Sequence, residues 1–411
     1  MKSLKKLIFF VLAFGLFFSL MQTAFALESD IESDQETEIK SIVSGYFNLQ
    51  HEVLSELASQ ERVEQGMNKA SSFAANEYAE KFETVLKMAL AHRSSQAVDL
   101  SYDKYDINLD YRMISITGSN ATVKVFVTEQ IYFNADPSVM SEAGTLHTIT
   151  LLKQDNMWLI NGDSFELDGY GQTYEKYKKQ YAQVGLTKQS ESNYILEAYS
   201  QEISQDIERR MRINELDENA TNLEIAQEAS LMLTSHNYDP TDPVEYAHNY
   251  CRTNNPSPWE TLDLDCTNFT SIALNTDIPM DTSGNKWYWN TRTDRSASWA
   301  SAEYFRRYIY NNNNSTSSNS GIYGKHDTYA NCGLGDIIQY ASNTDDIWNT
   351  DGRPVSTHSS IVTKVTTSGG RKLYVSMHSY GTDDSDYRYD YLVDSMPYSY
   401  KHYLNIVRYY S

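Results

Sequence analysis

The sequence predicts an α+β protein in which an N-terminal domain of helices and an antiparallel sheet is followed by a helical connector and a second domain. Three observations predict this fold. Apolar residues recur at helical spacing before residue 92, they alternate with period two between 98 and 164, and the composition turns to Asn, Ser, Thr, Tyr and Trp near residue 238. We therefore expect domains at 27–168 and 238–411, with the connector at 169–237.

Residues 1–26 are typical of a secretory signal peptide. Lysines precede an apolar run over residues 7–20, and Ala24-Phe25-Ala26 provides a site for cleavage after Ala26. The run is short for a membrane span, which favours cleavage over the alternative of an uncleaved anchor helix. We expect a secreted, extracellular protein, free or associated with the cell wall, that is not inserted in a membrane after cleavage.

The chain is acidic, with a formal net charge of −21. Nucleic acids and anionic membrane surfaces repel such a protein, so we expect no nucleic-acid partner and no capture by charge alone. Its 32 tyrosines offer large contact surfaces with a polar tip, which suit glycans or peptides. Alternatively, the high tyrosine content is a general feature of the composition of an exported protein and has no binding role. The composition does not predict an oligomeric state.

The N-terminal domain is predicted to be two amphipathic helices within 27–92 and an antiparallel meander with turns at GSNA and KQDN. The predicted strands cover 98–116, 121–133, 145–153 and 157–164. Helices on one face of such a sheet resemble the cone-shaped NTF2-like or cystatin-like architecture. His51, His92 and His147 each occur singly, and a lone histidine is far more often a surface or core residue than a catalytic one, so we expect no catalytic constellation in this domain.

The connector is predicted to be helical and exposed. Its segments YEKYKKQYAQV and YILEAYSQEISQDIERRMRI mix acidic and basic residues, which is typical of solvated helix faces. In the second domain, helical patterns are limited to 243–251, 266–275 and 298–311, and the C-terminal residues alternate like strands.

Cys266, in the segment DLDCTNFTSIAL, is predicted to be the first residue of a helix. Asp265 is a strong N-cap residue, and Phe269, Ile272 and Ala273 form an apolar stripe at helical spacing. A thiol at this position meets unpaired N–H groups and the positive end of the helix dipole, which both stabilise the nucleophilic thiolate. The same N–H groups could form part of an oxyanion hole.

The other two cysteines, Cys251 and Cys332, do not open helices. An odd number of cysteines in an oxidising compartment is compatible with one disulfide and one free thiol. If a disulfide forms, we expect it to join Cys251 to Cys332, which leaves Cys266 free. The alternative is that all three cysteines are reduced.

A predicted hairpin carries two histidines. HSSIVTKV and KLYVSMH are strands on either side of the turn signal SGG. Pairing them across the turn places His358 opposite His378, so both imidazoles would share one polar face. The opposite, core face would carry Ile361, Val365, Leu373, Val375 and Met377.

The segment GDIIQY is predicted to enter the same sheet, with Asp336 hydrogen-bonded inside the preceding turn. The loop that follows contains Asp345, Asp346 and Asp351, which are oxygen ligands of the type calcium prefers. Their spacing does not match an EF-hand, and we expect no metal.

Several segments of the second domain together resemble the amidase domain family of secreted Gram-positive proteins. They are YDPTDPVEYAHNYCRTNNPSPWETLDLDCTNFTSIAL, GDIIQY, HSSIV and YVSMHS, in the family's order, within residues 238–411. DCTNF is the most specific of them. The family is similar to the NlpC-type and CHAP-type cysteine hydrolases, so the resemblance implies a papain-like fold. It also implies Cys266 as nucleophile, His358 as general base and acid, and His378 as the orienting residue, with no cofactor.

The resemblance and the export signal together predict an exported cysteine hydrolase that cleaves an amide bond, with the peptide of peptidoglycan as substrate class. Trp259, Trp287, Trp289 and Trp299 could line its cleft or belong to the core. The alternative function is a non-enzymatic wall- or partner-binding protein with a retired hydrolase domain. A third interpretation keeps the chemistry but transfers the acyl group to an amine.

Overall fold

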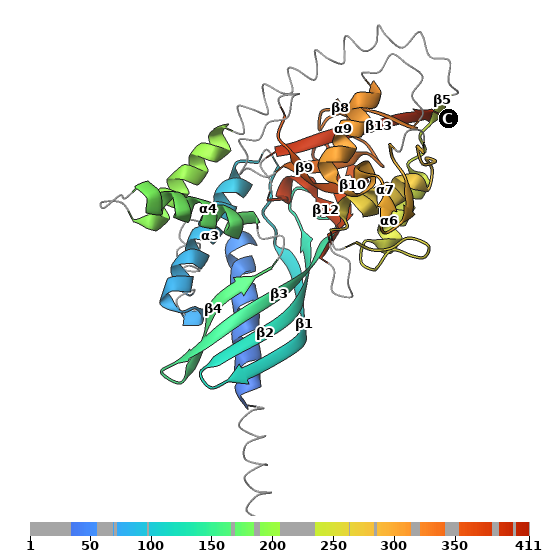
Figure 1. The fold of residues 1–411 in the computed structure, drawn as a ribbon. Helices are drawn as coiled ribbons and strands as arrows, with labels where there is room; N and C mark the ends of the chain where they lie inside the picture. The colour runs from blue at the N-terminus through green and yellow to red at the C-terminus, as the bar shows by residue number, and fades with distance from the viewer. Residues whose placement is uncertain are drawn as a thin grey trace, which may run out of the picture.

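A computed structural model describes residues 34–55, 69, 72–96, 98–165, 169–184, 190–205, 235–262, 264–282, 286–313, 321–341, 353–379, 386–397 and 400–410. Within these residues, helices pack against a large antiparallel sheet, which confirms the predicted α+β class (Figure 1). None of the described helices is long and apolar enough to cross a membrane. The predicted signal peptide and the three aspartates before His358 lie outside the described residues.

The N-terminal domain packs helices on one face of an antiparallel sheet. Its elements are helical residues 34–55, α3 (Asn76–Ser94), β1 (Lys104–Thr117), β2 (Asn120–Tyr132), β3 (Ser141–Gln154) and β4 (Met157–Ser164). The strands lie in the order β1-β2-β3-β4, as a meander requires. Val123, Val125 and Val127 alternate into the core between sheet and helices, as the period-two pattern predicts.

The first half of the predicted connector packs on the N-terminal domain. It contains α4 (Gly169–Val184) and helical residues 191–205. Tyr174 and Tyr177 of α4 form a buried cluster with Met88 of α3. This part of the connector therefore extends the N-terminal domain, while residues 206–234 lie outside the described chain.

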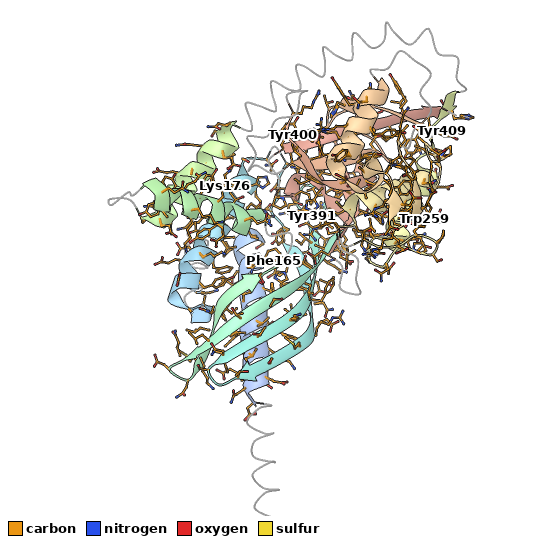
Figure 2. The ribbon with its side chains drawn as sticks, viewed as in Figure 1. Phe165, Lys176, Trp259, Tyr391, Tyr400 and Tyr409 are labelled. Atoms are coloured by element: carbon orange, nitrogen blue, oxygen red, sulfur yellow. The ribbon has the colours of Figure 1, made fainter. Side chains whose placement is uncertain are left out.

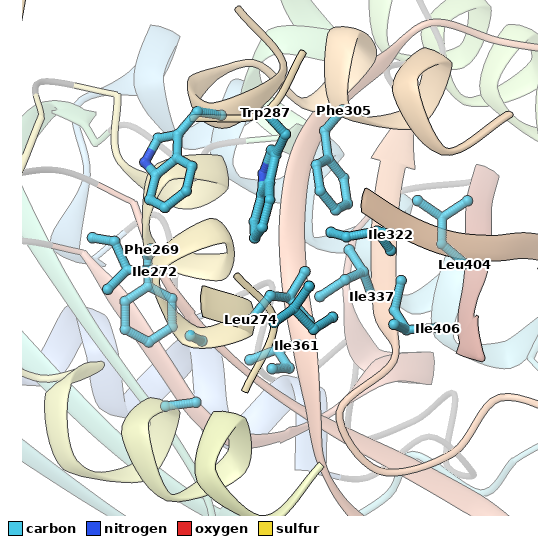
Figure 3. Packing of buried hydrophobic residues seen from close by; sticks show 14 of the residues in the cluster. Phe269, Ile272, Leu274, Trp287, Phe305, Ile322, Ile337, Ile361, Leu404 and Ile406 are labelled. Carbon is cyan, nitrogen blue, oxygen red and sulfur yellow. The ribbon is translucent and has the colours of Figure 1, made fainter. Parts of the chain in front are cut away.

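The C-terminal domain surrounds α7 (Cys266–Asn275), in which every residue from Cys266 to Leu274 is buried. Phe269, Ile272 and Leu274 of α7 pack in one core with Trp287 and Ile361 (Figure 3). The other elements are α6 (Thr241–Tyr250), α8 (Ala297–Ala300), α9 (Ala302–Asn313), η1 (Val393–Ser395), β5 (Ser235–Asn237), β6 (Trp289–Thr291), β7 (Asp294–Arg295), β8 (Gly321–Asp327), β9 (Ile337–Ala341), β10 (Ser356–Thr366), β11 (Lys372–His378), β12 (Tyr387–Leu392) and β13 (Tyr400–Tyr410).

One sheet runs through both domains. Among the described strands its order is β1-β2-β3-β12-β11-β10-β9-β13-β5, with β4 beside β3 and β8 beside β13. The junction is the antiparallel pair of β3 with β12, which joins Glu142 to Tyr389 and Gly144 to Tyr387. Figure 2 shows Tyr391 close to the level at which the two domains meet, and its ring contacts Phe133 of the N-terminal domain. The two domains therefore share main-chain hydrogen bonds as well as side-chain packing.

The hairpin of β10 and β11 forms as predicted, but its register differs by one residue from the prediction. Ile361 pairs with Ser376, and continuing this register would set Ser359, not His358, opposite His378. The predicted core face is right except at one residue. Ile361 packs with α7 on the other side of the sheet, because the register shifts between Val362 and Lys364. The remaining members pack together as predicted: Val365, Leu373, Val375 and Met377. Every residue of β11 is buried, so alternation of polar and apolar residues could not define its register.

Candidate active site

Cys266 is the first residue of α7, as the sequence predicts, and 8% of its surface is exposed. Helix α7 packs across β10 and β11, which brings its N-terminus to the strands that carry the two histidines. The Cys266 Sγ atom accepts a hydrogen bond from the Ser359 backbone and lies 3.8 Å from the Thr267 hydroxyl. The thiol is therefore located where α7 meets β10.

Asp265 occupies the N-cap position, but its side chain does not cap the helix. Its carboxylate instead accepts a hydrogen bond of 2.8 Å from His378 Nδ1, and both side chains are completely buried. Asn255 donates to the same oxygen at 3.0 Å, and Asn268 donates to the other oxygen at 2.8 Å. Because a carboxylate only accepts, Nδ1 of His378 must carry the proton.

Burial raises the pKa of the Cys266 thiol, and the Ser359 and Thr267 hydrogen bonds only partly oppose this effect. The Asp265 carboxylate adds to the increase in pKa, because it places a negative charge beside the sulfur. The expected effect of the helix N-terminus on the thiolate is therefore outweighed in this structure. The thiol keeps its proton at rest, and a base must remove it before or during attack.

His358 is half-buried and belongs to β10, where it pairs with Tyr340 of β9. The Tyr340 hydroxyl bonds Ser360 at 3.1 Å, so strand alternation assigns His358 to the sheet face turned away from α7. Ser359, the next residue, faces α7 and bonds Thr267 at 3.0 Å. The backbone of His358 consequently borders the thiol, although the two histidines do not share one face as predicted.

The remaining cysteines are also free and buried, so the structure has three reduced cysteines, which is one of the two alternatives left open by the sequence, and not a Cys251–Cys332 disulfide. Cys251 packs in the α7 core, whereas Cys332 packs on the opposite side of the sheet, in the cluster of Leu373. The central sheet therefore separates the two thiols. Burial raises the pKa of both.

Asp336 accepts a hydrogen bond of 2.6 Å from the Gly333 backbone, which confirms its predicted role in the turn. It also accepts from the Ile406 backbone at 2.8 Å and so ties the turn to β13. Burial raises the pKa of this carboxyl group to about 7. In the part of the chain that the structure describes, no three His, Cys, Asp or Glu side chains are grouped to hold a metal ion.

Three of the four candidate cleft tryptophans, Trp287, Trp289 and Trp299, belong to the core. Trp259 is half-buried near the outer margin of the C-terminal domain, where its ring stacks on Trp299 at 5.6 Å (Figure 2). The Trp299 indole donates to Asn268 at 2.8 Å. The aromatic cluster therefore supports the first turn of α7 and the Asp265 carboxylate.

Sequence reasoning missed Asp265, Asn255 and Ser359 as members of this site. The sequence predicts only a helix cap at Asp265, because local sequence does not reveal a partner more than one hundred residues away. The available signals were the Asp directly before the Cys and the Asn-Pro ten residues earlier.

Residues 237–406 match the family model described as "Putative amidase domain". The match includes Cys266, Asp265 and both histidines, and the residues before 237 lie outside it. No curated protein and no solved structure was found to match the chain. The match supports an amidase-domain hydrolase in this part of the chain.

Proposed function

We propose that the protein is an exported, cysteine-dependent hydrolase of amide bonds that acts on the peptide of the cell wall. One observation carries the chemistry. A cysteine thiol at the start of a helix lies directly beside a buried histidine–carboxylate pair, which is the arrangement that nucleophilic catalysis needs. The amidase-domain match supports the bond type. Two features favour a wall substrate. They are the predicted N-terminal signal sequence and the resemblance of the second domain to the amidase domain family of secreted Gram-positive proteins.

In this proposal Cys266 is the nucleophile and His358 is the base and acid. The resemblance gives His358 this role, and its backbone borders the thiol. Because strand alternation turns its imidazole away from α7, the imidazole must reach Cys266 around the N-terminal end of β10. His378 is completely buried and has Nδ1 fixed by Asp265, which suits an orienting role.

The reaction balances without a cofactor. His358 takes the thiol proton as Sγ bonds to the amide carbonyl carbon, and the N–H groups at the start of α7 stabilise the oxyanion. The C–N bond then breaks, and the imidazolium returns its proton to the leaving amine. Water hydrolyses the thioester and releases the carboxylic acid and the thiol.

The first test follows alkylation of the full chain by iodoacetamide against pH, with each cysteine read by mass spectrometry. We expect Cys266 to react through the pH range of an imidazole, because His358 accepts its proton. In His358→Ala the reaction should begin only above the ordinary thiol range, because burial raises the pKa of Cys266. Cys251 and Cys332 are internal controls, since both are free and completely buried.

Unreactive Cys266 in the wild type, or activity that survives Cys266→Ala, would contradict the proposal and favour a binding protein. If His378→Ala, and not His358→Ala, removes the low-pH reactivity, His378 is the base and Asp265 its orienting group. With wall peptides as substrate, products that contain a new amide bond would indicate transpeptidation instead of hydrolysis.

A further inference from the structure

The edge of the C-terminal domain next to His378 is completed by the N-terminal domain. Tyr387 of β12 pairs with His378 on one side and with Gly144 of β3 on the other. Adjacent strands are about 4.8 Å apart, so the N-terminal domain begins about 10 Å from the backbone of His378. Strand β3 lies entirely outside the family match, which starts at residue 237.

Glu142 of β3 holds two side chains of the C-terminal domain. Its Oε1 atom accepts from Arg252 Nε at 2.6 Å and from the Tyr387 hydroxyl at 2.9 Å. Gln130 donates to the other oxygen at 2.7 Å, and 7% of the Glu142 side chain is exposed. Burial opposes ionisation of this carboxyl group, but the hydrogen bonds from Arg252 and Gln130 outweigh it and hold its pKa below the ordinary value.

The Arg252 contact leads directly to the Asp265 carboxylate. Arg252 follows Cys251, the C-cap residue of α6, and its guanidinium lies 3.6 Å above the centre of the Tyr389 ring. Three residues later, Asn255 donates to the same Asp265 oxygen that binds His378. Fixing Arg252 therefore fixes one end of the short segment that orients the Asp265–His378 pair.

The main chain supplies a second connection between the N-terminal domain and the site. The Leu146 backbone donates to the Asp386 carboxylate at 2.9 Å, and the Asp386 carbonyl accepts from Ser379 at 2.8 Å. The Ser379 carbonyl in turn accepts from the Asp265 backbone at 3.0 Å. Both connections begin in β3 and end at Asp265.

The Tyr387 ring packs closely against Gly144 at this junction. A Cβ atom added to Gly144 would lie 2.3 Å from the Tyr387 ring and 2.8 Å from the Phe126 ring. The Tyr387 ring is therefore seated on the glycine while its hydroxyl reaches Glu142. Ring and hydroxyl together fix β12 against the strand that carries His378.

We propose that Glu142, in the N-terminal domain, is a positioning residue for the Cys266–His378 site, acting through Arg252 and Tyr387. The N-terminal domain is accordingly part of the catalytic unit and not a separate targeting module. This inference rests on the proposed function, because it uses the reactivity of Cys266 as its readout.

The test compares Glu142→Ala with Trp158→Phe in the full chain. Trp158 is completely buried in the N-terminal core and does not contact the junction, so its substitution reports on destabilisation alone. Thermal melting and the pH profile of Cys266 alkylation are measured on the same samples. We expect Glu142→Ala to lower the alkylation rate near neutral pH by about tenfold, and Glu142→Asp to restore part of it, because small displacements of a catalytic group have large effects. Trp158→Phe should lower the melting temperature and leave the profile unchanged.

The inference is wrong if Glu142→Ala keeps the wild-type profile while its melting temperature falls. If Glu142→Ala does not fold, Tyr387→Phe decides, because it removes one hydroxyl and leaves the ring on Gly144. It should shift the profile in the same direction by a smaller amount, and an unchanged profile would overturn the inference. A wild-type protein whose Cys266 is unreactive rejects the proposed function itself, and the inference with it.

Discussion

Each domain contains a buried histidine–carboxylate pair of nearly the same length, and the two pairs differ in what surrounds them. In the N-terminal domain, His147 Nδ1 lies 3.0 Å from Asp163, and the Phe47 and Phe165 rings contact the imidazole. In the C-terminal domain, the Asp265–His378 pair has Cys266 as its immediate neighbour. A histidine–carboxylate pair by itself is a structural element, and the adjacent thiol at a helix start is what makes one of them a candidate site.

The electrostatics of the N-terminal pair agree with a structural role. Burial opposes protonation of His147, but the charges of Asp163 and Glu129 outweigh it and raise the pKa of the imidazole. Tyr46 adds a hydrogen bond of 3.2 Å to Asp163. The pair therefore ties β3 to β4, and the Tyr46 hydrogen bond joins it to the helix over residues 34–55.

The largest expected difference between the two pairs is in reactivity. Asp265→Asn should reduce amide hydrolysis and low-pH alkylation of Cys266 by about a hundredfold, because outer residues that orient a catalytic imidazole have effects of this order. Asp163→Asn should lower the melting temperature and leave the Cys266 pH profile intact. Equal loss of reactivity in both variants would show that domain stability, not orientation of His378, controls the site.

A second comparison concerns two glycines, one at the domain junction and one outside it. Gly144→Ala forces a Cβ atom against Tyr387 and Phe126, and overpacking of this kind costs about 1–3 kcal/mol. Gly118→Ala meets no atom within 4 Å, but it places Ala at a φ of +61°, which costs about 1–2 kcal/mol. Both variants should melt earlier, and only Gly144→Ala should also slow alkylation of Cys266. A normal Cys266 rate in Gly144→Ala would argue that the junction does not position the site.

Two carboxyl groups, Glu129 in the N-terminal domain and Asp336 in the C-terminal domain, should contribute to stability with opposite dependence on pH. Burial opposes ionisation of Glu129, but His51 outweighs it and holds the pKa at about 2, so its contribution is present above the ordinary pKa of 4.5 and is lost as pH falls toward 2. The pKa of Asp336 is raised to about 7, so the folded state binds a proton that the unfolded state releases above its ordinary pKa of 3.8. Stability from Asp336 is therefore lost as pH rises from about 4 to 7, by at most about 1.4 kcal/mol per pH unit.

The free energy of unfolding, measured against pH in two variants, tests these opposite pH dependences. Asp336→Asn should reduce the loss of stability between about pH 4 and 7, and Glu129→Gln should reduce the loss of stability in acid. The absolute stability of Asp336→Asn should fall, because the amide cannot accept all the backbone N–H groups that the carboxylate accepts. Slopes identical to wild type would contradict the assigned pKa values.

The smallest expected effect is at Ser359. Its hydroxyl bonds Thr267 and Gln339, each at 3.0 Å, whereas its backbone is what bonds the Cys266 sulfur. Ser359→Ala should therefore cost about 1 kcal/mol in the free energy of unfolding and leave Cys266 alkylation nearly unchanged. A large loss of reactivity would mean that the hydroxyl, and not the backbone, controls the thiol.

Local sequence patterns predicted the elements better than the contacts between them. The helix that begins at Cys266 and the β10–β11 hairpin were predictable, because helix-start residues and turn residues are local signals. The register was not predictable, because β11 is buried on both faces and offers no polar side to identify. The carboxylate partner of His378 was also not predictable, because Asp265 lies in another element far away in sequence.

The start of β3 is instructive for a similar reason. The prediction began this strand at 145, but the structure extends it to Ser141. The additional residues, Ser141 to Gly144, have little strand propensity. They are extended because they pair with β2 on one side and, from Glu142 to Gly144, with β12 of the other domain on the other side. Tertiary pairing here determined a local structure that composition did not favour.

The pairing of β3 with β12 also bears on how the protein can be divided for expression. In the full chain, β12 is an interior strand with neighbours on both sides. A fragment that begins at residue 237 would turn β12 into a sheet edge, with a row of unpaired N–H and C=O groups facing water. Such an edge is a template for pairing with a second molecule, so the fragment is expected to self-associate or aggregate. The boundary of the soluble unit therefore lies upstream of β1, well before the boundary of the family match.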